Sequence, residues 1–144
     1  MSRKKIIRTI DVPPKFIKFG VFDNENNAKE FEYLNIDEYE AIRLVDYENL
    51  NHNNASKIMN ISRPTLTRIL NSARRKIAEF LINGTNLIII NNDAKFLKNW
   101  YGCCDCKYFW IVKYNEKQEF CPKCNSKNIK NGLDCLNKLS NIKF

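Results

Sequence analysis

Four cysteines stand in two pairs that have the spacing of metal ligands. Cys103 and Cys106 form one Cys-x-x-Cys pair, and Cys121 and Cys124 form a second pair, with 14 residues between the two. Each pair can present two thiolates to one point, and four thiolates complete a tetrahedral Zn²⁺ site. We therefore predict one structural zinc ion. A closed site of four thiolates has no open position for water, which argues against a catalytic metal.

Alternatives remain for one of the four ligands and for the identity of the metal. Cys104 competes with its neighbour Cys103, which we favour because the Cys-x-x-Cys spacing turns both sulfurs inward. Iron is the main alternative metal for four thiolates. A redox dithiol explains the sequence less well, because one reactive pair would not need a matching second pair. We interpret Cys135 as a small apolar residue near the C-terminal end.

The residues around these cysteines predict a zinc ribbon. Residues 108–114 are rich in strand formers and residues 115–117 can turn, so a β-hairpin is expected within residues 107–120. In so small a unit, metal binding supplies much of the folding free energy. The aromatic side chains either build a small core, which we favour, or stack on single-stranded bases. They are Trp100, Tyr101, Tyr108, Phe109, Trp110, Tyr114 and Phe120.

Residues 55–69, ASKIMNISRPTLTRI, predict two helices joined by a tight turn. The first helix should span about residues 51–59. Asn60 stands at the turn, and asparagine tolerates left-handed backbone better than most residues. Ser62 is a good N-cap, and Pro64 falls in the first turn of the next helix, where a missing N–H costs little. This is the layout of a helix-turn-helix, which places its second helix in the DNA major groove.

The second helix should carry the DNA contacts. Apolar residues recur at spacings of three and four from Leu66 to Phe80, and Asn83-Gly84 is a normal helix end. The polar residues point outward, although an ordinary amphipathic hairpin with a solvated charged face is the alternative. Contacts with base edges are predicted for Arg63, Thr65, Thr67, Arg68 and Asn71. Phosphate contacts are predicted for Lys57, Ser62, Arg74, Arg75 and Lys76.

Another helix should precede this hairpin. Asn35 and Glu38 resemble a capping box that starts it. Its apolar side chains (Tyr39, Ile42, Leu44, Val45 and Leu50) should pack on the hairpin, and its acidic ones should be solvated, namely Glu38, Glu40, Asp46 and Glu48. Residues 16–22 form an extended segment or strand, residues 23–27 a polar loop and residues 86–91 a strand.

These elements predict a mainly α-helical helix-turn-helix domain followed by a small β zinc-ribbon domain. Residues 1–34 form a basic arm (Arg3, Lys4, Lys5 and Arg8) with an extended segment after Pro13-Pro14. Residues 35–92 form the helix-turn-helix domain. Residues 93–144 form the ribbon and a C-terminal tail.

The charge distribution fits a polyanionic partner. The 144 residues carry a formal net charge of +8. Residues 21–50 are strongly acidic, whereas the segments before and after them are each net basic. The acidic block should therefore face away from a nucleic acid.

Composition also limits location and activity. The longest aliphatic run, residues 87–90, is too short to cross a bilayer, and the start lacks the apolar core of a secretory signal. We expect a cytoplasmic protein whose cysteines are not disulfides. One histidine and four glycines leave little from which to build a catalytic triad or a phosphate loop, so we expect no enzyme.

Residues 34–87 resemble an uncharacterised family of small prokaryotic predicted DNA-binding proteins. The matching stretches are DEYEAIRL, SRPTLTRIL and SARRKIAEFLING, together with the basic start and Pro13-Pro14. The helix-turn-helix of that family is similar to region 4 of σ70-type sigma factors, and some members carry a C-terminal ribbon like CCDC…CPKC here. The resemblance implies a DNA-binding fold. Asn60 departs from it, since glycine is usual at that turn.

Two functions from different classes follow. The first is a sequence-specific transcriptional regulator that binds double-stranded DNA in the major groove, as a homodimer or with a partner because one such module reads few base pairs. The second is an adaptor whose ribbon binds RNA polymerase or RNA without DNA sequence specificity. A preferred DNA sequence would distinguish the first from the second. A third idea is that the ribbon senses zinc.

Overall fold

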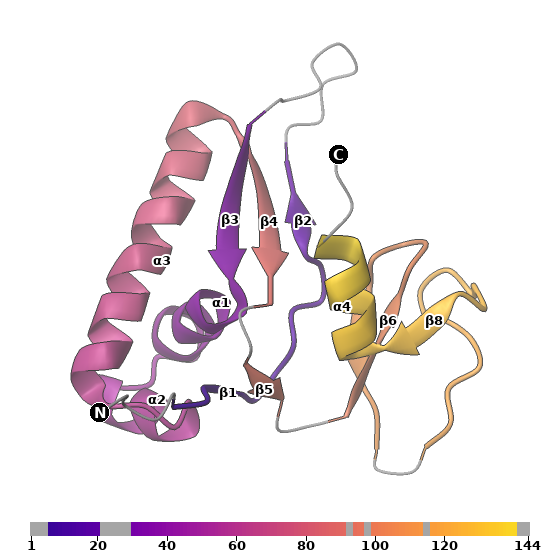
Figure 1. Cartoon of the computed structure of the whole chain (residues 1–144), viewed down its shortest axis with the longest axis horizontal. Helices are drawn as coiled ribbons and strands as arrows, with labels where there is room; N and C mark the ends of the chain where they lie inside the picture. The colour runs from indigo at the N-terminus through magenta and orange to yellow at the C-terminus, as the bar shows by residue number, and fades with distance from the viewer. Residues whose placement is uncertain (1–5, 21–29, 92–93, 97–98, 114–115, 141–144) are drawn as a thin grey trace, which may run out of the picture.

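The computed structural model describes residues 6–20, 30–91, 94–96, 99–113 and 116–140. Its elements, drawn in Figure 1, are the strands β1 (Thr9–Ile10), β2 (Lys18–Phe19) and β3 (Phe31–Asn35), then helix α1 (Ile36–Ile42), the π-helical turn η1 (Arg43–Tyr47), α2 (His52–Ile58), α3 (Arg63–Asn83), β4 (Asn86–Ile90), β5 (Lys95–Phe96), β6 (Trp100–Cys103), β7 (Phe109–Ile111), β8 (Ile129–Asn131) and α4 (Gly132–Ser140).

The predicted fold class, a mainly α-helical domain followed by a small β ribbon, is wrong. The described residues form eight strands in three small sheets, ordered β1-β5, β2-β4-β3 and β7-β6-β8. Four of these strands, β1 to β4, lie before residue 93, where strands were expected only at residues 86–91 and, as an alternative to an extended segment, at 16–22. The strands of the two sheets outside the ribbon span two to five residues, too few for a clear alternation of apolar and polar residues.

The central sheet is built around β4. Its sequence, NLIII, is apolar without alternation, and Leu87, Ile88 and Ile89 are all buried. Such a run is typical of a strand covered on both faces. β3 pairs with it in parallel, β2 pairs with it antiparallel, and both α1 and α4 contact it. In Figure 1, α1 and α3 lie to one side of this sheet and α4 to the other.

Local capping residues fix the ends of the helices where the sequence predicted them. The backbone N–H of Asn35 donates to Oε2 of Glu38 at 2.8 Å, which completes the capping box of α1. Asn60 has a φ of 56°, in the left-handed region. Ser62 accepts from the N–H of Thr65 at the start of α3. Gly84, with a φ of 64°, ends that helix because glycine adopts this backbone without strain.

The solvated acidic face predicted before the hairpin is half wrong. Asp46 and Glu48 are exposed, but Glu38 and Glu40 are buried. Both buried carboxylates pair with cations, Lys76 for Glu38 and Arg43 for Glu40. Burial is possible because each charge is compensated at close range.

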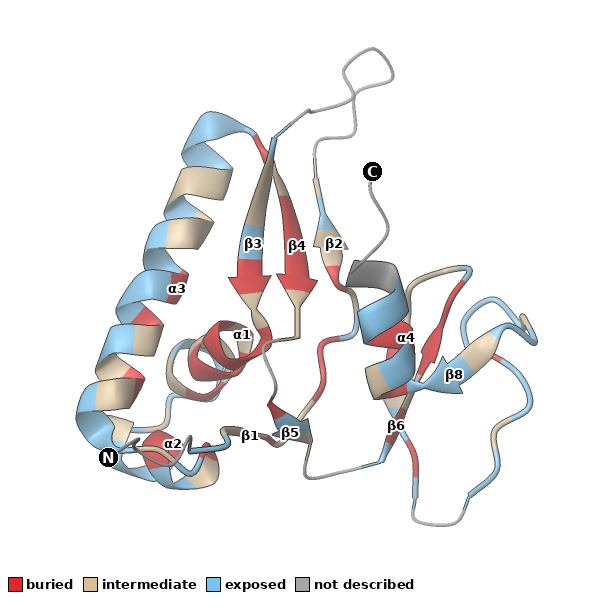
Figure 2. Cartoon of the chain, viewed as in Figure 1, coloured by how far each residue is buried: buried red, intermediate tan, exposed pale blue. Residues whose placement is uncertain are grey.

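Two apolar cores hold the chain together. One joins α1, α2 and α3 through Ala41, Leu44, Ala55, Met59, Leu66 and Leu70. The other runs from Ile10 and Ile17 through the central sheet to Trp100, Phe109 and Leu136. The second core therefore crosses the expected domain boundary between residues 92 and 93. Figure 2 shows buried residues on β4, α1, β6 and α4.

The N-terminal segment belongs to this body from residue 6 onward. β1 pairs in parallel with β5, and the N–H of Thr9 donates to the carbonyl of Met59 at 3.1 Å. Further on, the carbonyl of Lys15 accepts from the N–H of Phe109. The basic residues Arg3, Lys4 and Lys5 and the predicted loop at 23–27 lie outside the described residues.

The described strands of the ribbon form a different hairpin from the one predicted within residues 107–120, of which residues 114–115 lie outside the described residues. β7 pairs antiparallel with β6, so the strands flank the first cysteine pair, and β8 pairs with the other edge of β6. The turn between β6 and β7 was not predicted as a hairpin turn, because it is formed around the pair Cys103 and Cys106. Gly132 starts α4 against Trp100, where a Cβ would lie 2.1 Å from a ring atom.

Candidate metal centre and helix surface

The four predicted cysteine ligands converge. The Sγ atoms of Cys103, Cys106, Cys121 and Cys124 all lie within 4.8 Å of one another, and two of these pairs, Cys103–Cys124 and Cys106–Cys121, are 3.6 Å apart. Four sulfurs about 2.3 Å from a central ion stand roughly 3.8 Å apart in a tetrahedron. The cluster therefore fits a metal ion bound by four thiolates.

Two matching turns position these sulfurs. The N–H of Lys107 donates to the carbonyl of Cys103, and the N–H of Asn125 donates to the carbonyl of Cys121. Lys107 and Asn125 both adopt left-handed backbone, with φ of 64° and 62°. That conformation costs a non-glycine residue about 1–2 kcal/mol. It turns the chain sharply, so that both sulfurs of each pair face the same point.

The thiols of the cluster differ in acidity. Burial raises the pKa of Cys106 to about 12. Burial also opposes ionisation of Cys121, but backbone N–H groups of Cys124 and Lys123 and the neighbouring thiols lower its pKa to about 7. Four crowded thiolates repel one another, and a divalent cation removes that repulsion.

Cys104 stands outside the cluster, as the sequence predicted. Its side chain is buried, with Sγ 3.4 Å from Sγ of Cys135 in α4. Burial raises the pKa of Cys135 to about 12. The two behave as small apolar residues of the core between β6 and α4.

The predicted contact residues lie on α2, at the N-cap of α3 and on α3 itself. Lys57, Ser62, Arg63, Arg68, Asn71, Arg74 and Arg75 are exposed, whereas Thr65, Thr67 and Lys76 are half-buried. At 100° per residue, Arg68, Asn71 and Arg75 follow one line along α3, opposite the buried Leu66, Leu70 and Ala73. The helix therefore presents one polar ridge to solvent.

The hydroxyl groups of the predicted DNA-contact residues form hydrogen bonds within the protein. Ser62 Oγ donates to Thr65 Oγ1 at 2.8 Å, and Arg68 Nη2 donates to the same oxygen at 3.3 Å. Thr67 Oγ1 donates to the carbonyl of Arg63 and lies 3.3 Å from Nδ1 of His52. These bonds position the first two turns of α3 and place Arg68 over them.

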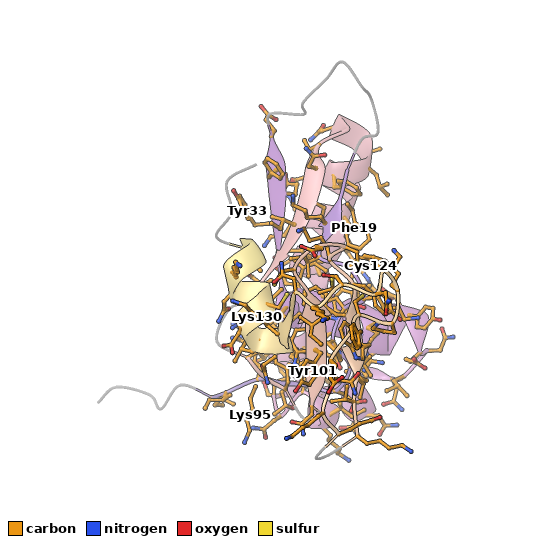
Figure 3. The ribbon with its side chains drawn as sticks, turned by 90° about the vertical axis from the view of Figure 1, so that its right-hand side faces the viewer. Phe19, Tyr33, Lys95, Tyr101, Cys124 and Lys130 are labelled. Carbon is orange, nitrogen blue, oxygen red and sulfur yellow. The ribbon has the colours of Figure 1, made fainter. Side chains whose placement is uncertain are left out.

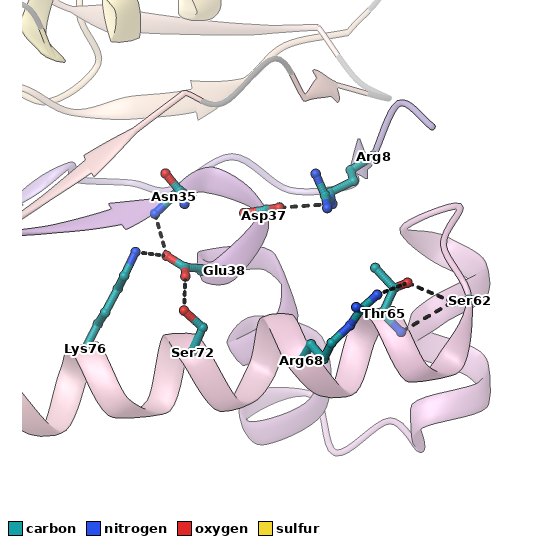
Figure 4. A network of polar contacts seen from close by, with 9 residues as sticks. All are labelled: Arg8, Asn35, Asp37, Glu38, Ser62, Thr65, Arg68, Ser72 and Lys76. Atoms are coloured by element: carbon teal, nitrogen blue, oxygen red, sulfur yellow. Dashed lines mark hydrogen bonds and ion pairs between the residues drawn. The ribbon is translucent and has the colours of Figure 1, made fainter. Parts of the chain in front are cut away.

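The cations in the second half of α3 have acidic partners. Lys76 Nζ contacts Oε2 of Glu38 at 2.8 Å, and Ser72 Oγ donates to Oε1 of the same carboxylate at 2.6 Å (Figure 4). Arg74 pairs with Asp46 at 2.6 Å, and Arg75 pairs with Glu79 at 3.0 Å. The last two pairs are exposed and exchange readily with other anions.

A pocket of about 450 Å³, which the sequence did not predict, borders the start of α3. Arg68, Ser72, Asp37 and Arg8 are among its lining residues. Arg8 pairs with buried Asp37 at 3.1 Å, as Figure 4 shows, while the second carboxylate oxygen of Asp37 has no hydrogen-bond partner among the described residues. No sequence signal links residues 8 and 37, because tertiary structure alone brings them together.

Figure 3 views the molecule from the ribbon side, with Tyr101, Cys124 and Lys130 labelled.

Within the described residues, no helix has both the length and the apolar character needed to cross a lipid bilayer.

Comparison with known proteins gives a family and no solved structure. Residues 1–96 match the family model described as "Protein of unknown function DUF134". The chain is 37% identical over 131 residues to a UPF0251 protein of Methanothermobacter thermautotrophicus, which covers 90% of this chain and 67% of that protein. It is 36% identical over 129 residues to a UPF0251 protein of Chloroherpeton thalassium, an alignment that covers 90% of this chain and 85% of that protein. It is 41% identical over 126 residues to a UPF0251 protein of Pelotomaculum thermopropionicum, an alignment that covers 88% of this chain and 95% of that protein. No solved structure matches the chain.

Proposed function

We propose that this chain, which belongs to the DUF134 family of uncharacterised prokaryotic proteins, is a sequence-specific DNA-binding protein that inserts the first half of α3 into the major groove. The observation that carries this proposal is the polar ridge of α3 (Arg68, Asn71 and Arg75), which faces solvent while α2 packs across the other side of the helix. Helix-turn-helix proteins read base edges with such a ridge.

Arg68 and Asn71 are the best placed of the predicted base-reading residues. They are exposed, and Arg68 projects over the turn that Ser62 caps. Arginine forms paired hydrogen bonds with guanine, and asparagine does so with adenine. Thr65 and Thr67 are better explained as groups that orient α3, because their hydroxyls already have partners.

Phosphate contacts would flank this ridge. Arg74 lies along one flank of α3, and Arg75 follows the ridge one turn beyond Asn71. The exposed pairs of Arg74 and Arg75 can be exchanged for phosphate oxygens at small cost. A role in transcription regulation follows from sequence-specific binding, and a homodimer would double the length of DNA read.

The roles of two arginines on one helix test this proposal. Arg68→Ala should weaken binding to a preferred duplex roughly 10- to 100-fold while leaving random duplex nearly unaffected. Arg75→Ala should weaken both duplexes alike and lower the slope of log affinity against log salt by about one. Fluorescence anisotropy over a salt series measures both, with Lys138→Ala on α4 as the control. Equal loss of sequence preference in the two arginine variants would contradict the division of roles.

We propose further that the metal is Zn²⁺ in a structural role. Four sulfurs at tetrahedral spacing suit Zn²⁺, and four thiolates leave no position for water. Iron is the competing metal for this donor set. Metal analysis of the purified chain should find one zinc per chain. Iron in its place, with the visible absorption of an iron–thiolate site, would refute this identification.

A further inference from the structure

The two faces of the ribbon sheet differ in what covers them. Neighbouring residues of a strand point to opposite faces, and directly paired residues share a face. Gly102 pairs with Phe109, and Tyr101 pairs with Trp110, so these two pairs occupy opposite faces. A Cβ on Gly102 would lie 2.8 Å from Sγ of Cys135, which places α4 over the face of Gly102. Tyr101 and Trp110 therefore lie on the face away from α4.

This second face carries a row of four aromatic rings. Ring centroids are 5.7 Å apart for Phe16 and Tyr108, 6.0 Å for Tyr108 and Trp110, and 6.2 Å for Trp110 and Tyr101. The last two pairs are nearly parallel, at 15° and 24°. All four rings are half-buried, so each keeps exposed area. We call these residues, Phe16, Tyr101, Tyr108 and Trp110, the aromatic face.

Positive charge borders the aromatic face at both ends. At one end, Nζ of Lys123 lies 4.2 Å from the ring centroid of Phe16. At the other end, Tyr101 helps to line a pocket of about 340 Å³ that also contains Lys113, Glu116, Lys117 and Asn131. Residues 85–144 as a whole contain ten lysines and five acidic residues. The surroundings of the rings therefore favour a polyanion.

We infer that the aromatic face binds single-stranded nucleic acid. Bases would stack on Trp110 and Tyr101, and backbone phosphates would contact the lysines at the two ends. A row of rings inside a positively charged surface is the usual basis of single-strand binding without strong sequence preference. Duplex nucleic acid would bind poorly here, because its base faces are stacked inside the helix. This site is separate from α3 and goes beyond the function proposed above.

Trp110 allows a direct test with the full-length, metal-loaded chain. Labelled oligothymidylate and oligouridylate of about 12 nucleotides would be titrated at roughly 0.15 M salt. Trp110→Leu and Tyr101→Leu should each weaken binding roughly 5- to 100-fold. Ile111→Ala is the matched control, since Ile111 neighbours Trp110 on β7 but points to the opposite face. Circular dichroism and metal content verify that each variant is folded.

A second readout protects the test against a misfolded variant. Oligonucleotide should quench tryptophan fluorescence of the unchanged chain, and Lys113→Gln with Lys117→Gln should lower the salt slope by about one to two. Tighter binding of the uridylate would identify RNA as the natural strand, and tighter binding of the thymidylate would identify DNA. The inference is overturned if neither oligonucleotide binds, or if Trp110→Leu loses no more affinity than Ile111→Ala. Arg68→Ala should leave single-strand binding unchanged, which separates this site from the duplex-binding proposal.

Discussion

Glu38 makes both a local interaction at the start of α1 and tertiary interactions with α3. Its side chain is buried and accepts from the N–H of Asn35, from Ser72 Oγ and from Lys76 Nζ. One carboxylate thus caps α1 and joins it to α3. The capping role was predictable because Asn35 and Glu38 are three residues apart. Its burial was not, because Lys76 is 38 residues away.

Removing this carboxylate should destabilise the whole chain. Glu38→Ala leaves the Lys76 ammonium and the Asn35 N–H without their partner, which should lower the free energy of unfolding by about 2–4 kcal/mol. Urea denaturation followed by circular dichroism measures the change. Glu48→Ala is the control, because that side chain is 48% exposed and should cost less than about 1 kcal/mol. Equal effects of the two changes would mean that the buried network contributes nothing.

Cysteine substitutions should separate metal ligands from core residues. Cys121→Ser removes a sulfur from the cluster and should abolish stoichiometric metal binding and lower Tm by more than 10 °C, since ligand loss removes several kcal/mol. Cys104→Ser, one residue from Cys103, should retain one metal per chain. Metal analysis and thermal melting give both numbers. Loss of the metal in Cys104→Ser would place Cys104 in the ligand set.

At the scale of elements, the sequence predicted the helix ends, because capping and turn residues lie close to them in the chain. Asn51, Asn60, Ser62 and Gly84 set the ends of α2 and α3 within a few residues, and the structure confirms all of them. β3 was missed because its five residues pair in parallel with β4, about fifty positions later. Such non-local pairing leaves no local signature in a short strand.

The pair of Arg74 and Asp46 ties α3 to η1 and should do so in a pH-dependent way. The hydrogen bond from Arg74 holds the pKa of Asp46 below its usual range. Its stabilisation is therefore present above the unfolded pKa, near 4, and is lost as pH falls through the lowered folded value. A double-mutant cycle of Arg74→Ala and Asp46→Asn should give a coupling below about 1 kcal/mol at pH 7 that vanishes near pH 2. A coupling that grows on acidification would contradict the pairing.

At the scale of the molecule, the main core runs without a break from Ile10 to Leu136. The sequence suggested separate domains because the two metal-ligand pairs and the helical hairpin are each complete local motifs. Nothing local indicated that β1 would pair with β5, or that Ile17 and Trp100 would share one core. Contacts between motifs depend on side-chain packing rather than on sequence spacing.

The shared core predicts that the metal-loaded chain unfolds in one step. Trp100 and Trp110 both lie in the ribbon, so tryptophan fluorescence reports the ribbon, while far-ultraviolet circular dichroism reports mainly α1, α2 and α3. The two melting curves should have one midpoint. Separate midpoints would show that the ribbon folds independently, as the sequence suggested.

The central claim is that α3 recognises DNA sequence, and selection from a random pool of duplexes tests it most directly. Zinc-loaded protein at near-physiological salt should enrich one short motif, and a palindromic motif would indicate a dimer. Arg68→Ala in a parallel selection should relax that motif at one position. A pool that stays random after several rounds, despite measurable binding, would contradict the claim and leave the basic ridge as a non-specific contact.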